Sequence, residues 1–191
     1  VSMDLLQTWR AKGVNLAQTY GMTEAFSVAI LPPHRAKDRI GSAGHRMLHT
    51  RLRIFGRDGK EVAPGEVGEI RIRGPAVTPG YWRKPEETKK AFEDGWFKTG
   101  DAGRMLEDGM IYIVDRYKDM YISGGENIYP AEIENALSDH PAVLAAAVVG
   151  VDNAKWGQVG LAVIQLRSGQ QLDQEQLKAF LFGQPGEAAD N

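Results

Sequence analysis

The sequence predicts an α+β fold built from three consecutive segments. Residues 1–39 combine a short helix with a strand, the pattern expected for a remnant of an α/β layer from a large domain. Residues 40–115 contain many short strands separated by Gly and Pro, which is typical of a small β-barrel-like subdomain. Residues 119–191 return to alternating helices and strands, which predicts a small, incomplete α+β domain at the C-terminus.

Composition narrows the function classes. The 191 residues are 42% hydrophobic, which is enough for a core, and 23 basic against 25 acidic residues give a net charge of −2. This balance does not indicate a nucleic-acid-binding surface. The absence of cysteine excludes disulfides and thiolate metal sites and fits a cytoplasmic protein. Apolar runs are shorter than the about 18 residues of a transmembrane segment, and the N-terminus lacks a signal-peptide pattern.

The charge is distributed unevenly along the chain. Residues 1–115 carry 18 basic and 15 acidic side chains, whereas residues 116–191 carry 5 basic and 10 acidic ones. The sign of the net charge therefore changes near Asp115-Arg116, which favours a domain boundary at this point.

The first segment begins with a helix that Asp4 is suited to cap and that Gly13 is expected to end. Residues 14–17 then read as a short buried strand. The rest of an α/β layer is missing from the sequence, so we expect that the chain has been cut from a larger protein.

Alternation and turn dipeptides predict the remaining elements. In the middle segment we expect strands at residues 51–55, 69–73, 104–106 and 110–114, turns at Asp58-Gly59, Pro64-Gly65 and Asp108-Gly109, and a helix at 85–92 that begins with Pro85. In the last segment we expect strands at 121–123, 143–149 and 159–166, a helix from Pro130 to His140-Pro141, a capping box of Asp173 and Gln176, and a frayed tail at 183–191.

The first polar cluster that could carry chemistry is Gln18-Thr19-Tyr20-Gly21-Met22-Thr23-Glu24, a loop expected directly after a strand, where open α/β sheets bind ligands. Tyr20 offers a flat face for a base, and Gly21 permits a close turn of the backbone. Thr23 offers a hydroxyl to a phosphate, and Glu24 is an oxygen ligand suited to Mg²⁺. The alternative is an ordinary polar turn.

Two further clusters have similar alternatives. Trp96-Phe97-Lys98-Thr99-Gly100-Asp101 places a carboxylate after a tight Gly turn, which suits vicinal ribose hydroxyls or a simple turn cap. Asp115-Arg116-Tyr117-Lys118-Asp119 is either a solvated turn or a hinge with a ligand-contacting arginine. In Ser123-Gly124-Gly125-Glu126-Asn127, the glycines would let a ligand or another backbone approach closely.

The order and spacing of these motifs resemble the signature series of the AMP-forming acyl-CoA synthetases, from about Gln18 to Leu166. The fatty-acyl and feruloyl-type ligases are the most similar branch, and the chain resembles the last third of such an enzyme. The motifs that carry the resemblance are Tyr20-Gly21-Met22-Thr23-Glu24, Gly68-Glu69-Ile70, Gly80-Tyr81-Trp82, Pro85-Glu86-Glu87-Thr88, Thr99-Gly100-Asp101, Asp115-Arg116, Lys118-Asp119 and Gly124-Gly125-Glu126-Asn127.

The resemblance implies a two-step reaction that uses ATP, Mg²⁺ and CoA. A small-molecule carboxylic acid, such as a fatty acid, attacks the α-phosphorus of ATP, which gives acyl-AMP and pyrophosphate. The thiol of CoA then attacks the acyl carbon and releases AMP. A small C-terminal domain rotates between the two steps, so the resemblance implies a hinge at residues 116–118 and a mobile domain at 119–191.

The resemblance also implies roles for individual residues. Tyr20 stacks on adenine beside Gly21, Thr23 contacts the α-phosphate, and Glu24 holds Mg²⁺. Asp101 accepts from the ribose hydroxyls with help from Arg116, Lys118 is the hinge, and Gly124 and Gly125 lie beside the pantetheine tunnel. Trp156-Gly157 is also similar to the family but has no assigned role.

Two parts of the family pattern are missing from the sequence. We expect the family's Thr/Ser/Gly-rich phosphate loop to belong to an N-terminal portion outside this sequence. No lysine follows Lys178, so we expect the general catalytic lysine to be absent as well. We therefore expect the parent enzyme to be a ligase and this chain alone to be inactive. The alternatives are an adenylating enzyme that loads a carrier protein, and a truncated, non-catalytic binding module.

Overall fold

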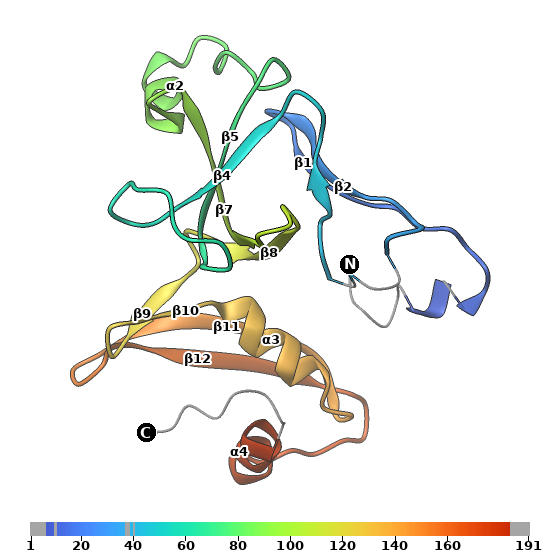
Figure 1. The fold of residues 1–191 in the computed structure, drawn as a ribbon. Coiled ribbons are helices and arrows are strands. Elements are labelled where there is room, and N and C mark those ends of the chain that lie inside the picture. Colours follow the sequence, from blue (N-terminus) through green and yellow to red (C-terminus); the bar gives the residue numbers. More distant parts are fainter. Residues whose placement is uncertain (1–6, 10, 37–38, 40, 184–191) are drawn as a thin grey trace. The chain divides into compact units, whose positions relative to one another are not determined.

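In the computed structural model of the chain, residues 7–9, 11–36, 39 and 41–183 are described. The expected helix cap Asp4 and the expected frayed tail beyond residue 183 lie outside these residues. The chain divides into two compact units, residues 1–118 and residues 119–191. The α+β class is confirmed, because antiparallel sheets and short helices occur in the chain (Figure 1).

The first unit contains a three-stranded antiparallel sheet in the order β1-β2-β3. Its strands are β1 (Gln18–Met22), β2 (Phe26–Leu31) and β3 (His45–Arg46). The strand expected at residues 14–17 is wrong, because pairing begins only at Gln18, opposite Leu31. The segment 18–24 is therefore not a loop after a strand: its first five residues form β1, and the turn to β2 follows.

A second antiparallel sheet of the same unit has five strands in the order β4-β5-β7-β6, with β8 also paired to β7. Its elements are β4 (Arg51–Phe55), β5 (Gly68–Arg73), α2 (Pro85–Ala91), β6 (Phe92–Glu93), β7 (Trp96–Met105) and β8 (Ile111–Arg116). The β-barrel-like subdomain expected here does not close: the described strands form an open sheet, in which β4 lies at one edge. The strands expected at 51–55, 69–73 and 110–114 are confirmed within two residues, as are the turns at residues 58–59, 64–65 and 108–109 and the helix that begins at Pro85. The strand expected at 104–106 is instead the end of the longer strand β7.

Alternation explains how this sheet forms its core. Along β4, Leu52 and Ile54 are buried, while Arg51 and Arg53, which alternate with them, are exposed. Ile70 and Ile72 on β5 and Phe97 on β7 belong to the same cluster. Each such side chain contributes roughly 1.5–3 kcal/mol when it is fully buried.

Strand β7 contains a bulge that the sequence did not reveal. Arg71 of β5 pairs with Lys98 of β7, but Glu69 pairs with Ala102, so β7 carries extra residues around Gly100. Gly100 has φ +71°, which favours glycine. The expected tight turn before Asp101 is therefore wrong: the segment is a strand interrupted by a bulge.

The second unit is a four-stranded sheet in the order β10-β9-β12-β11 with two helices. Its elements are β9 (Tyr121–Ser123), β10 (Glu126–Ile128), α3 (Pro130–Ser138), β11 (Val143–Asn153), β12 (Gly157–Leu166) and α4 (Gln174–Gly183). Its core contains Tyr121, Leu137 and Val148. The expected capping box is confirmed, since Gln176 N donates to Asp173 Oδ1 at 2.8 Å and Asp173 N donates to Gln176 Oε1 at 3.1 Å. Among the described residues, we find no helix with the length and apolar character needed to cross a membrane.

Gly44 and Gly41 provide a matched test of the packing in the first unit. Both have positive φ, +89° and +84°. A Cβ on Gly44 would lie 1.9 Å from the carbonyl oxygen of Ile30, whereas a Cβ on Gly41 would meet nothing within 4 Å. We expect Gly41→Ala to cost about 1 kcal/mol of unfolding free energy and Gly44→Ala about 3 kcal/mol or more, measured by urea unfolding. Equal losses would contradict this packing.

Candidate functional site

The candidate site is centred on Asp101, which lies in the bulge of β7, between Lys98 and Ala102, the residues that pair with β5. This residue is only 6% exposed, an uncommon position for a carboxylate unless it is paired. Burial of a charge is costly, so the groups around Asp101 must compensate it.

Two other residues named in the sequence analysis supply this compensation. Tyr20 Oη donates a hydrogen bond to Asp101 Oδ2 at 2.7 Å, and Arg116 Nη1 contacts Asp101 Oδ1 at 2.7 Å. Arg116 lies directly opposite Asp101 in the β7–β8 register. Tyr20 comes from β1, 81 residues earlier in the chain. The structure therefore brings together Tyr20, Asp101 and Arg116.

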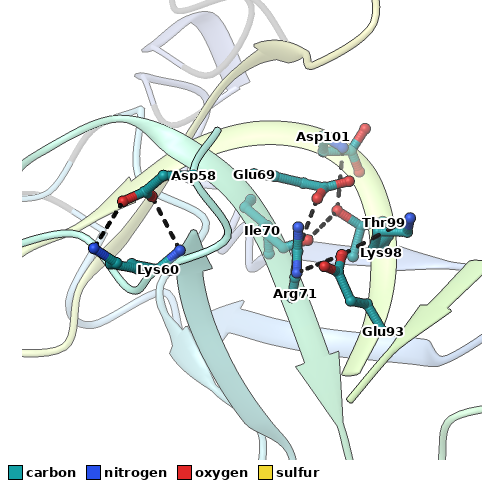
Figure 2. A network of polar contacts seen from close by, with 9 residues as sticks. All are labelled: Asp58, Lys60, Glu69, Ile70, Arg71, Glu93, Lys98, Thr99 and Asp101. Carbon is teal, nitrogen blue, oxygen red and sulfur yellow. Dashed lines mark hydrogen bonds and ion pairs between the residues drawn. The ribbon is translucent and has the colours of Figure 1, made fainter. Parts of the chain in front are cut away.

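Thr99 holds the bulge and was missed by sequence reasoning as a site residue. Asp101 N donates to Thr99 Oγ1 at 3.1 Å, and Thr99 Oγ1 donates to the carbonyl oxygen of Ile70 at 2.7 Å (Figure 2). The hydroxyl thus ties the backbone of Asp101 to β5. A threonine two residues before an aspartate, across a glycine, is a known pattern for such local bonds and was the available signal.

The environment of Tyr20 favours its protonated form. Burial, followed by the hydrogen bond to Asp101 and the charge of that carboxylate, raises the pKa of the Tyr20 phenol far above its ordinary value of about 10. The phenol therefore remains a hydrogen-bond donor to Asp101 at neutral pH.

Glu24 lies in the turn after β1, beside a second tyrosine. Tyr81 Oη donates to Glu24 Oε1 at 2.9 Å, and the backbone carbonyl of Glu24 accepts from Thr78 N at 2.7 Å. Burial and the contact with Glu24 raise the pKa of the Tyr81 phenol. The described residues contain no cluster of three or more acidic, His or Cys side chains that could hold a metal ion. A single carboxylate fits Mg²⁺ only in the mode in which substrate phosphates supply further ligands.

Gly21 and Thr23 occupy the same hairpin. A Cβ on Gly21 would lie 1.8 Å from the carbonyl oxygen of Phe26, so the close approach of β1 and β2 requires glycine here. Thr23 is exposed in the turn.

Lys118 is exposed and is the last residue of the first unit. The residue before it is fixed to the bulge, since Tyr117 N donates to the carbonyl oxygen of Gly100 at 2.8 Å. Lys118 therefore follows directly after the last anchored residue of this unit.

The expected glycine pair belongs to the second unit. Gly124 and Gly125 join β9 to β10 with φ of +60° and +95°, which is the pattern of a two-residue type I′ turn. A Cβ on Gly124 would approach the Trp156 ring to 3.0 Å, and Gly124 N donates to the Trp156 carbonyl at 2.9 Å. Trp156, which had no role in the sequence analysis, therefore packs on this turn.

Two protein-family models match separate parts of the chain. Residues 1–82 match the family described as AMP-binding enzyme, and residues 132–190 match the AMP-binding enzyme C-terminal domain. Among curated relatives, the 2-succinylbenzoate–CoA ligase of Geobacillus kaustophilus is 49% identical over 177 residues, which are 92% of this chain and 36% of the relative. The feruloyl-CoA synthase of an Amycolatopsis species is 46% identical over 182 residues, 95% of this chain and 37% of that enzyme.

Solved structures give a similar picture. The o-succinylbenzoate CoA synthetase MenE of Bacillus subtilis, in complex with the acyl-adenylate intermediate OSB-AMP, is 39% identical with a TM-score of 0.85; the match covers 93% of this chain and 36% of MenE. ATP-bound MatB from Rhodopseudomonas palustris is 37% identical with a TM-score of 0.84, over 97% of this chain and 37% of MatB. The chain thus spans a little over a third of the length of the relatives it matches.

The contact between Tyr20 and Asp101 predicts a specific dependence of stability on pH. At neutral pH, Tyr20→Phe removes a hydrogen bond to a charged group and should cost roughly 1.5–3 kcal/mol of unfolding free energy. Because the pKa of Tyr20 is raised in the folded chain, its contribution is fully present below about pH 10 and is lost as the pH rises further, by up to about 1.4 kcal/mol per pH unit.

Urea unfolding of both proteins between neutral and strongly alkaline pH measures this effect. Tyr81 and Tyr121 also have raised pKa values, but they are present in both proteins and cancel in the difference. The stability difference between the chain and Tyr20→Phe should therefore shrink above about pH 10. A constant difference would show that the phenol does not donate to Asp101.

Proposed function

Since its two parts match the AMP-binding enzyme and the C-terminal domain of that enzyme, the chain belongs to the AMP-binding enzyme family, and we propose that it forms part of an ATP-dependent acyl-CoA ligase. In the proposed reaction, a carboxylate oxygen attacks the α-phosphorus of ATP and pyrophosphate leaves. The sulfur of CoA then attacks the acyl carbon, the acyl–phosphate bond breaks, and AMP leaves. The observation that carries the proposal is the buried Asp101 carboxylate between Tyr20 and Arg116.

In this proposal Asp101 binds the ribose. Each oxygen of a carboxylate has two acceptor sites, and each oxygen of Asp101 accepts from one protein donor. One acceptor site on each oxygen therefore remains for the two vicinal hydroxyls. Arg116, with its side chain 57% exposed, reaches from solvent to this carboxylate and offers further donors to the nucleotide.

The Tyr20 ring provides the proposed stacking surface for adenine. Its hydroxyl is fixed on Asp101, so the ring orientation is set before the nucleotide binds. We propose that Gly21, next in the strand, serves the site by letting β1 and β2 approach closely, since the carbonyl oxygen of Phe26 takes the place of a side chain.

We propose that Thr23 donates to the α-phosphate and that Glu24 is the protein ligand of Mg²⁺, which would offset phosphate charge when bound. Tyr81 orients the Glu24 carboxylate by its hydrogen bond to Oε1. Gly124 and Gly125 are proposed to flank the pantetheine arm of CoA, because a turn without side chains permits close approach.

We also propose an aromatic carboxylic acid as the substrate class. Three relatives are named as a 2-succinylbenzoate–CoA ligase, a feruloyl-CoA synthase and an indoleacetate–CoA ligase. The acyl group in each of these names contains an aromatic ring. The chain spans little more than a third of these relatives, so the complete reaction is proposed, and tested, for the longer protein that contains it.

The decisive experiment is Asp101→Ala in that longer protein. The substitution removes two charge-assisted hydrogen bonds to ribose, and water recovers part of the loss. We expect kcat/KM for ATP to fall by roughly 30- to 900-fold, or about 2–4 kcal/mol. The variant should also discriminate less than the parent against ATP analogues that lack a ribose hydroxyl. Urea unfolding, run alongside, corrects for any loss of folded protein.

Asp108→Ala is the matched control, because Asp108 is a turn-capping aspartate of the same unit. Its carboxylate accepts from Met110 N at 3.0 Å and pairs with Arg39 at 2.7 Å. This variant should lose about 1 kcal/mol of stability and keep the parent's kinetics for ATP. If both variants behave alike, or if Asp101→Ala keeps full discrimination against deoxy analogues, Asp101 does not bind ribose.

A second test in the longer protein concerns Lys118 as the hinge. Proline fixes φ near −65° and removes a donor, so Lys118→Pro should restrict the rotation between the two half-reactions. We expect acyl-CoA formation to slow at least about tenfold more than acyl-AMP formation, when the two steps are timed separately. Lys118→Ala, which keeps the backbone freedom, is the control. Equal slowing of both steps by proline would argue against the hinge.

A further inference from the structure

A basic hollow lies in the first unit, beside the ends of β4 and β5. Its lining includes Arg46, His49, Arg51 and Arg73, together with Thr50, Gly74 and Pro75, and contains no carboxylate. None of these residues belongs to the site around Asp101. The hollow therefore requires its own explanation.

The register of β4 and β5 places arginines opposite one another twice. Arg53 pairs with Arg71, and Arg51 pairs with Arg73. Residues directly opposite in an antiparallel pair have their side chains on the same face, about 5 Å apart at Cβ. Like charges in this arrangement destabilise a sheet unless negative groups compensate them.

The inner pair, Arg53 and Arg71, is compensated by carboxylates of the chain itself; the outer pair is Arg51 and Arg73. Arg53 Nη1 lies 2.8 Å from Glu61 Oε2. Arg71 lies 2.9 Å from both Glu69 Oε2 and Glu93 Oε2, as Figure 2 shows. Three glutamates thus neutralise two arginines.

The outer pair has no such compensation. In the described part of the chain, no carboxylate lies within ion-pair distance of Arg51 or Arg73. Arg46 adds a third guanidinium to the same hollow, and its Nη1 donates to the carbonyl oxygen of Thr50 at 3.0 Å. Three arginines therefore line the hollow, and the guanidinium of Arg73 lies 3.5 Å from the position that a Cβ on Gly95 would take.

The backbone that carries these groups is closely fitted. His49 has φ +67°, an uncommon conformation for a residue other than glycine. A Cβ on Gly74 would lie 2.5 Å from the carbonyl oxygen of His49, so the two segments of the lining approach closely. Thr50, between them, is 5% exposed.

We propose that this hollow binds a phosphate group. Guanidinium groups bind phosphate oxygens by paired, charge-assisted hydrogen bonds, and a phosphate dianion supplies the negative charge that the outer arginine pair lacks. The same chemistry is offered by free inorganic phosphate and by a phosphate monoester. The inference does not depend on the proposed ligase activity.

The test is a calorimetric titration of the 191-residue chain with inorganic phosphate, against potassium chloride of equal ionic strength. We expect Arg73→Gln and Arg51→Gln each to raise the dissociation constant for phosphate about tenfold or more. Lys89→Gln removes the same charge from α2, outside the hollow, and should leave the dissociation constant for phosphate unchanged. Arg73→Lys keeps the charge but loses the planar fork, so it should weaken binding less than Arg73→Gln.

Thermal unfolding provides a second readout that a purely structural role would not give. In chloride, Arg51→Gln should unfold at the same or a higher temperature than the parent chain, because it relieves the repulsion from Arg73. In phosphate, the parent should be stabilised and this variant should not. Circular dichroism in chloride establishes that each variant is folded.

Glycerol 3-phosphate, titrated in the same way, distinguishes the source of the phosphate. Tighter binding than inorganic phosphate assigns the hollow to an ester, and weaker binding assigns it to the free anion. Absence of phosphate binding by the folded parent chain, or equal weakening by Lys89→Gln and Arg73→Gln, would overturn the proposal.

Discussion

The bulge in β7 is the constraint on which the candidate site depends. In a regular antiparallel pair, the pairing of Arg71 with Lys98 would place Glu69 opposite Gly100, whereas Glu69 lies opposite Ala102. The extra residues around Gly100 take Asp101 out of this register with β5, and its side chain reaches the Tyr20 hydroxyl. A second irregularity, in the β7–β8 pairing between Ala102 and Gly103, places Arg116 opposite Asp101. Gly100 supplies the positive φ that this path requires, and Thr99 ties the path to β5.

The same sheet also shows how charge is placed in the first unit. On one face, arginines of neighbouring strands stand opposite each other, and the structure treats the two pairs differently. Arg71 is buried, and its charge is compensated by the buried Glu69 and the exposed Glu93. The arginines at the strand ends remain at the surface, where only a group from outside the described chain could compensate them. Position along the strand therefore separates structural charges from charges that are available to a ligand.

Local patterns explain why much of the fold could be predicted from the sequence. The alternation at residues 51–55 and 69–73, the Asp108-Gly109 turn and the reciprocal bonds of Asp173 and Gln176 each depend on residues a few positions apart. The start of β1 could not be predicted in this way, because its strand is defined by pairing with β2 rather than by its own alternation. The bulge was missed for a related reason: Trp96-Phe97-Lys98-Thr99-Gly100-Asp101 contains the residues of a turn, and only the partners β5 and β8 keep it extended.

The candidate site shows the limit of sequence reasoning more clearly. Tyr20 and Asp101 were both singled out, but their contact joins residues 81 positions apart and has no local signal. This contact changes the role that each residue can have in the site. Asp101 is not an isolated acceptor, because one acceptor site on each oxygen is already used, and Tyr20 is not a loosely held ring, because its hydroxyl is anchored.

In the proposed function, the hydrogen bond between Tyr20 and Asp101 means that the groups that recognise base and ribose are joined to each other. The entropy of fixing the ring and the carboxylate is lost when the chain folds rather than when the nucleotide binds. The remaining acceptor sites of Asp101 have fixed directions, set by the donors that already occupy the others. Ribose recognition then depends on the angle between Tyr20 and Arg116 as much as on the charge of Asp101, which is why a bulge held by Thr99 is a functional feature rather than a local irregularity of the strand.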